Sequence, residues 1–191
     1  LVVASLAAGL PLPLLPAQIL WLNLVTNGIQ DVALAFEPKE GDVLARSPRA
    51  PDEPIANRLM IERTLVAAAV IGGVGFAAFV WLLERGVAVE AARNQLLSLI
   101  VLFEIVNIGN ARSETQSIVA LSPLRSPILL IGTLAAFLVH LGAVYTPLGQ
   151  SVLSTAPIEP VRWVTLGGLA LTIAVALETH AHSWRRRQSN D

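Results

Sequence analysis

A run of polar side chains interrupts an otherwise apolar block near the beginning of the chain. The residues are Asn23, Thr26, Asn27, Gln30 and Asp31. At 100° per residue of an α-helix, they fall on one stripe about 140° wide. Hydroxyl, amide and carboxylate oxygens that converge from one face are the ligands a hard cation needs when it loses its hydration shell. The stripe therefore predicts part of a cation site, and interhelical hydrogen bonding is the alternative use of such residues.

A further carboxylate, Glu104, lies in the middle of a later apolar block, with Asn107 three residues on and hence on the same helix face. Because a charged Glu in hydrocarbon needs a cation or a hydrogen-bond donor, we expect Glu104 to face the polar stripe. A neutral Glu104 that only ties two helices together is the alternative. Gly28, inside the stripe, favours a local unwinding that would free backbone carbonyls. Leu99 is expected to face lipid.

Other kinds of chemistry find little support in the residue types. The absence of cysteine excludes disulfides and thiolate metal sites. His140 is alone in its apolar block and is expected to be packed and hydrogen-bonded, because one imidazole makes no metal site. No Gly-rich phosphate loop or zinc motif is present. We therefore assign no catalytic and no cofactor-binding residue, and a net charge of -1 argues against a nucleic-acid partner.

The composition indicates that these residues are carried by membrane helices. Of the 191 residues, 54% are hydrophobic and only 14% are charged, against about 25% charged in soluble domains. The apolar residues fall in blocks of the roughly 20 residues that a helix needs to cross a bilayer. We predict an all-α polytopic membrane helix bundle of about five full spans plus a truncated first helix. The expected spans are 1–10 (partial), 17–36, 64–83, 94–111, 127–146 and 161–180.

The basic residues predict the orientation of these spans. Ten of the 13 Lys and Arg residues lie at one set of helix ends: in the loop 37–63, after the span 94–111, before the span 127–146, and at the C-terminus. Only Arg85, Arg93 and Arg162 lie at the other set. Since positive charge is retained in the cytoplasm, we expect the loop 37–63 and the C-terminus to be cytoplasmic in a multi-pass protein of the cell membrane.

Two segments resemble a known family. The segment LWLNLVTNGIQDVALAFEP, residues 20–38, resembles the sixth transmembrane helix of P-type cation-transporting ATPases of the calcium-pump-like branch. The segment FEIVNIGNARSETQSI, residues 103–118, is similar to the eighth helix and its cytoplasmic exit. The resemblance implies that residues 1–191 are the C-terminal transmembrane domain of such a pump, with residues 1–10 as the end of the fifth helix. The chain also begins in mid-hydrophobic sequence, as a piece of a longer protein would.

The resemblance also implies a function and a set of ligands. Family ligand positions match Asn23, Thr26, Asn27 and Glu104, whereas Asp31 is a candidate from the polar stripe alone. Asn27 departs from the aspartate usual in calcium pumps, which removes one negative charge from the site.

The implied function is that of a membrane domain that supplies part of the ion site. The transported ion would be Ca²⁺, another hard cation or H⁺. ATP and Mg²⁺ would act only through domains this chain lacks, so the chain alone would not be catalytic. Its expected partners are the lipid bilayer and the N-terminal part of the pump. The alternatives are a fragment of a secondary transporter or channel, or a structural membrane bundle.

Overall fold

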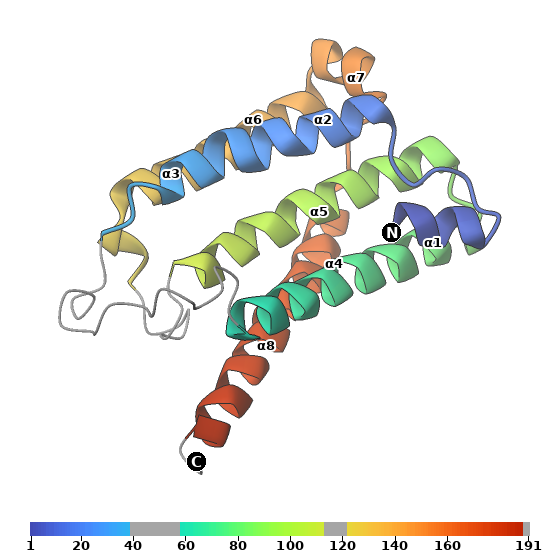
Figure 1. The fold of residues 1–191 in the computed structure, drawn as a ribbon. Helices are drawn as coiled ribbons and strands as arrows, with labels where there is room; N and C mark the ends of the chain where they lie inside the picture. The colour runs from blue at the N-terminus through green and yellow to red at the C-terminus, as the bar shows by residue number, and fades with distance from the viewer. Residues whose placement is uncertain (39–57, 113–121, 189–191) are drawn as a thin grey trace.

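The computed structural model describes residues 1–38, 58–112 and 122–188, and every regular element in these ranges is helical (Figure 1). The predicted all-α membrane bundle is confirmed. The elements are α1 (Val2–Ala7), α2 (Pro16–Val25), the π-helix η1 (Thr26–Asp31), α3 (Val32–Leu34), α4 (Arg58–Glu84), α5 (Val89–Ala111), the 3₁₀ turn η4 (Pro123–Arg125), α6 (Pro127–Tyr145), α7 (Pro147–Leu153) and α8 (Pro160–Gln188).

Four helices of the described part are long and apolar enough to cross a membrane, namely α4, α5, α6 and α8. The remaining expected span, 17–36, coincides with α2, η1 and α3, which follow one another without a break over residues 16–34. We call this continuous element the α2–η1–α3 helix. It runs alongside α6 (Figure 1). The expected partial helix at 1–10 is α1, which is followed by Gly9 in the left-handed region at φ 67°.

Local sequence sets the helix ends. Proline opens α2, α6, α7 and α8, where its missing N–H costs no helical hydrogen bond. The N-cap hydroxyl of Ser126 accepts a bond from the Leu129 N–H at 3.4 Å, and that of Thr146 accepts from the Gly149 N–H at 3.3 Å. These caps satisfy N–H groups that lack an intrahelical partner. The tight turn between α4 and α5 uses Gly86 at φ 75°, a conformation that glycine adopts without strain.

Two boundaries differ from the expectation. Helix α4 begins at Arg58, so residues 58–63 are helical although we placed them in the loop 37–63. The extra turn is supported by an Arg58 to Glu62 pair at 2.8 Å, since residues four apart face each other on a helix. Helix α7, in the connection between α6 and α8, was not expected. Residues 39–57 of the predicted loop lie outside the described residues.

Helix α5 is the common neighbour of the other long helices (Figure 1). On one side it packs with α4 and α8 through a core that includes Phe103 and Ile173. On the other side Val101 meets Val25 of α2 and Ala136 of α6. The prediction that Leu99 faces lipid is therefore wrong, because α5 is surrounded by helices and Leu99 is fully buried against α8.

Candidate cation site

The polar stripe lies where the α2–η1–α3 helix changes its geometry. Residues Thr26 to Asp31 form a π-helical turn, η1, between two α-helical parts. Such turns insert an extra residue into a helix and are frequent at functional sites. The irregularity expected at Gly28 is present, in the form of a widened turn instead of an extended break. It changes the angular spacing of the stripe, because a π-turn advances less per residue than an α-helix does.

The side chains of the stripe differ in their surroundings. The Thr26 hydroxyl is buried and donates to the Leu22 carbonyl at 2.7 Å. Gln30 is 1% exposed, and its Nε2 has no hydrogen-bond partner among the described residues. Asn23 and Asp31 are exposed on the surface of the chain. The side chain of Asn27 lies outside the described residues.

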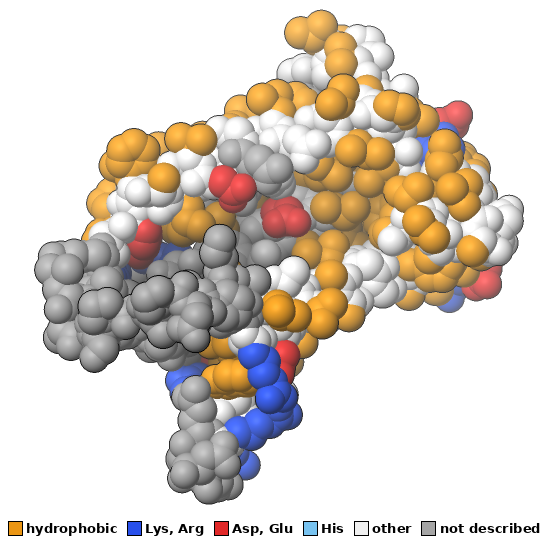
Figure 2. Space-filling model, viewed as in Figure 1, with side chains coloured by type: hydrophobic (Ala, Val, Ile, Leu, Met, Phe, Trp, Pro, Cys, Tyr) orange, Lys and Arg blue, Asp and Glu red, His pale blue; other side chains and the backbone are white. Residues whose placement is uncertain are grey.

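Glu104 and Asp31 are brought together by the packing of η1 on α5. Their carboxyl groups are close enough to interact electrostatically, and the Asn107 side chain hydrogen-bonds Glu104. Figure 2 shows acidic side chains near the hollow between the α2–η1–α3 helix and α5, with hydrophobic surface on one side of them. A cation near this pair would relieve the repulsion between two ionised carboxylates.

The described residues contain no group of three or more His, Cys, Asp or Glu side chains that could hold a metal. A cation at this place would therefore take its other ligands from hydroxyl, amide or backbone oxygens, which suit a hard cation. Of the predicted ligands, Asp31 and Glu104 lie within electrostatic range of each other across two helices. Thr26 and Asn23 lie on the same helix as Asp31, one and two turns before it. The Thr26 hydroxyl donates its proton to the Leu22 carbonyl of the same helix.

Helix α6 holds the α2–η1–α3 helix closely. A Cβ atom at Gly132 would lie 2.5 Å from the Cβ of Ala33 and 3.6 Å from the Ile29 carbonyl oxygen. Only glycine allows this approach, in the manner of small residues at interfaces between membrane helices. The position of the π-turn is thus determined from the side of α6 as well as from α5.

A buried histidine ties the same helix to two others. The Trp21 indole N–H donates to His140 Nδ1 at 3.2 Å, and His140 Nε2 lies 3.0 Å from the Ser98 hydroxyl. Because an indole can only donate, Nδ1 must accept and the ring proton sits on Nε2. His140 is fully buried and also meets Trp163 edge-on. It is packed and hydrogen-bonded, as its isolation in the sequence led us to expect.

The two ends of the α2–η1–α3 helix are held by contacts that the sequence reasoning missed. At its beginning, Gln18 accepts from the Leu15 N–H at 2.9 Å and donates to the Leu153 carbonyl of α7 at 3.0 Å. Gln18 and Leu153 are 135 positions apart in the chain, so no local sequence pattern predicts their contact. A polar glutamine inside an apolar block was the available signal.

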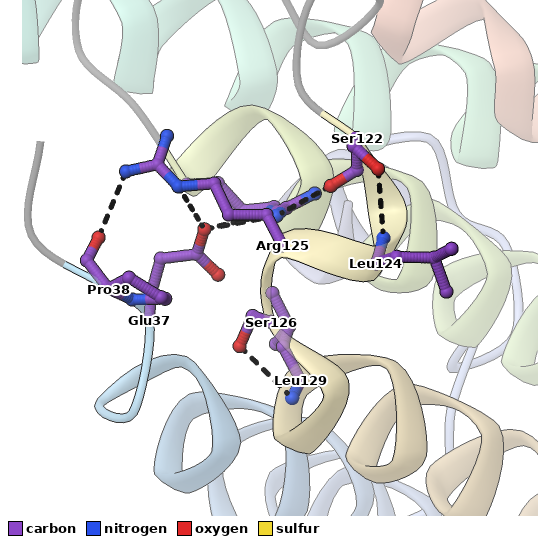
Figure 3. A network of polar contacts seen from close by, with 8 residues as sticks. Glu37, Pro38, Ser122, Leu124, Arg125, Ser126 and Leu129 are labelled. Atoms are coloured by element: carbon purple, nitrogen blue, oxygen red, sulfur yellow. Dashed lines mark hydrogen bonds and ion pairs between the residues drawn. The ribbon is translucent and has the colours of Figure 1, made fainter.

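The other end is held by a cluster of charged groups that we call the Glu37 cluster (Figure 3). Glu37 Oε1 accepts from Arg112 Nη2 at 3.0 Å and Nε at 3.2 Å, and lies 3.7 Å from Arg125 Nε. Arg112 and Arg125 also donate to the carbonyls of Ser122 and Pro38, both at 3.1 Å. The cluster joins the exits of α3 and α5 to the start of α6. We had interpreted these arginines only as markers of orientation.

Comparison with known proteins identifies the family of this helix bundle. The model of the family described as "Cation transporting ATPase, C-terminus" matches residues 11–182. The chain belongs to this family. It is 34% identical over 180 residues to the "Probable cation-transporting ATPase F" of Mycobacterium tuberculosis, covering 93% of this chain and 20% of the relative. The predicted resemblance to the C-terminal membrane region of P-type cation-transporting ATPases is confirmed, and with it a multi-pass membrane protein.

Relatives of this C-terminal ATPase region also come from distant organisms. The "Calcium-transporting ATPase" of Bacillus subtilis is 32% identical over 167 residues, covering 87% of this chain and 19% of the relative. The "Calcium-transporting ATPase type 2C member 2" of Mus musculus is 31% identical over 179 residues, covering 93% of this chain and 19% of the relative. The chain thus spans about a fifth of the length of the curated relatives it matches.

Proposed function

We propose that this chain is the transmembrane part of an ATP-driven cation pump and supplies one side of its ion site. The ligands would be Asn23, Thr26, Asn27, Asp31 and Glu104. The observation that carries the proposal is that Asp31 of η1 and Glu104 of α5 lie within electrostatic range of each other where the two helices pack. Two carboxylates at membrane depth are costly unless they serve an ion or a proton.

The π-turn supports this assignment. It lies in the segment that carries Thr26, Asn27 and Asp31, and its altered hydrogen bonding offers backbone oxygens that a regular α-helix would use internally. Such a set of oxygens suits Ca²⁺, which accepts several ligands in flexible geometry. Two of the relatives quoted above carry calcium transport in their names.

The rest of the transport cycle would belong to other parts of the protein. ATP hydrolysis requires Mg²⁺ ligands, phosphate-binding backbone and a positioned carboxylate, which are features of soluble domains. We propose that an N-terminal part of the pump supplies these domains and the remaining ion ligands. The loop 37–63 and the C-terminus would be cytoplasmic, because they belong to the set of helix ends that holds ten of the 13 basic residues.

Cation-dependent phosphorylation of the full-length pump by ATP tests this function. Glu104→Gln and Asp31→Asn should each shift the Ca²⁺ dependence to higher concentration, because each removes a charged ligand. Glu90→Gln is the matched control, since Glu90 is exposed in the first turn of the same helix. An unchanged Ca²⁺ dependence in both site variants would mean that the carboxylates only tie helices together.

A further inference from the structure

Two adjoining cavities lie at the end of the bundle opposite the Glu37 cluster. The larger has a volume of about 430 Å³ and lies between α4, α5 and α8, within the range of about 300–1,000 Å³ typical of ligand sites. Its walls are mostly apolar and include Val74, Trp81 and Leu169. Gln95 and Arg162 are its polar residues besides Thr165. It is a hydrophobic groove with a cationic end.

The smaller cavity, of about 230 Å³, shares Gln95 and Arg162 with the first, so the two adjoin. It lies under residues 156–159, which connect α7 to α8, and Asn94 and Glu159 also line it. A larger share of its lining residues is polar than in the first cavity. The larger, mostly apolar cavity in the helix bundle therefore adjoins a smaller, more polar cavity at the end of the bundle.

Asn94 is the most buried polar side chain of the smaller cavity. It is 3% exposed, and its Nδ2 donates to the Ala156 carbonyl at 2.6 Å. Its Oδ1 is buried and has no hydrogen-bond partner among the described residues. A buried acceptor without a donor costs free energy, so the site is suited to a ligand that brings an N–H or O–H group.

We propose that these two cavities together bind one anionic glycerophospholipid with hydroxyl groups on its head, of which phosphatidylglycerol is the simplest. An acyl chain would fill the apolar groove along Val74, Ala78 and Leu166. The phosphate would lie on the Arg162 guanidinium, which presents several N–H donors to phosphate oxygens. A head-group hydroxyl would donate to Asn94 Oδ1.

Charge and hydrogen bonding select this lipid over a zwitterionic one. Arg162 is half-buried, and its guanidinium makes no ion pair or hydrogen bond within the described residues, so an anionic phosphate would neutralise it. Phosphatidylcholine brings a cationic head without a hydroxyl donor and leaves Asn94 Oδ1 unsatisfied. The exposed Glu159 carboxylate at the rim can accept a second hydroxyl and would repel a head group of higher negative charge.

Native mass spectrometry of the full-length pump, without ATP or added cation, tests the proposal independently of transport. We expect phosphatidylglycerol to be retained about tenfold more tightly than phosphatidylcholine with the same acyl chains. Arg162→Gln should abolish the preference, and Arg162→Lys should keep most of it. Arg93→Gln is the matched control, because it removes the same charge nearby, where Arg93 Nε is already engaged with the Leu12 carbonyl at 2.8 Å.

Photo-crosslinking with a phosphatidylglycerol that carries a diazirine in its acyl chain locates the bound lipid. Labels should fall on residues 74–82 of α4 and 165–169 of α8. Equal retention of the two lipids, or equal loss of preference in Arg162→Gln and Arg93→Gln, would overturn the proposal. Labels confined to other helices, as expected if a protein segment fills the groove, would overturn it too.

Discussion

The Glu37 cluster should stabilise the packing of the C-terminal end of the α2–η1–α3 helix against α5 and α6. The carboxylate is 9% exposed, and its partners Arg112 and Arg125 are 8% and 24% exposed. Replacing Glu37 by Gln keeps the shape but removes the carboxylate that pairs with the buried Arg112 guanidinium. Breaking a buried ion pair costs about 3–5 kcal/mol.

We expect a cost at or just below the lower end of that range, about 2–3 kcal/mol. The reasons are that Arg125 is partly solvated, that both arginines keep a backbone carbonyl, and that the Gln carbonyl still accepts one bond. In the double variant Glu37→Gln with Arg112→Gln, no uncompensated buried charge remains on Arg112. The double variant should therefore cost less than the sum of the single variants, by about 1.5 kcal/mol.

Unfolding of the purified full-length pump in a mixed detergent series measures these costs as a double-mutant cycle. The matched control is the Arg58 to Glu62 pair, whose side chains are 77% and 26% exposed and which should show no measurable coupling. Strict additivity at Glu37 and Arg112 would refute the reasoning. Additivity would mean that the Glu37 cluster is a solvated surface contact that does not hold the α2–η1–α3 helix in place.

Three further predictions concern packing, orientation and activity. Gly132→Ala should destabilise the bundle by about 1–3 kcal/mol, because the added Cβ would overlap the Ala33 side chain. Gly142→Ala is the control on the same helix and should not destabilise it, because an added Cβ there would have no atom of a neighbouring helix within 4 Å in the described part of the chain. Thermal unfolding of the two variants compares their stabilities. Cysteines at Leu148, which is 76% exposed, and at Arg187 should label with a membrane-impermeant thiol reagent from opposite sides, and labelling of both from one side contradicts the proposed orientation. The purified chain alone should show no ATP turnover above a mock purification. Turnover that copurifies with the chain would contradict the proposal that other domains of the pump hydrolyse ATP.

Much of the bundle could be predicted because crossing a bilayer constrains length and composition so strongly. Apolar blocks of helical length marked α4, α5, α6 and α8, and prolines marked where helices begin. Helix α7 was missed because it is too short to leave a hydropathy signal, although Thr146 and Pro147 carry the residue types of a helix start. Hydropathy also says nothing about which neighbour covers an apolar face, which is why Leu99 was assigned to lipid.

The candidate site can be proposed from its residue types, but its geometry could not be derived from the sequence. Helical spacing placed Asn23, Thr26 and Asp31 on one face, and the cost of a carboxylate in hydrocarbon directed Glu104 toward them. The π-turn could not be derived in the same way, because it depends on how α5 and α6 press on the helix from two sides. The contacts of Trp21 with His140 and of Glu37 with Arg112 span 119 and 75 positions, so they exist only once the fold has formed.

Equilibrium binding of Ca²⁺ to the full-length pump in the absence of ATP tests the central claim most directly. If Glu104 and Asp31 supply charged ligands to one site, Glu104→Gln and Asp31→Asn should each weaken Ca²⁺ binding about tenfold or more, which corresponds to about 1.4 kcal/mol. The exposed control Glu90→Gln should leave the affinity unchanged. Wild-type affinity in both site variants, or a loss in Glu90→Gln as large as theirs, would contradict the assignment of a cation site to this pair of helices.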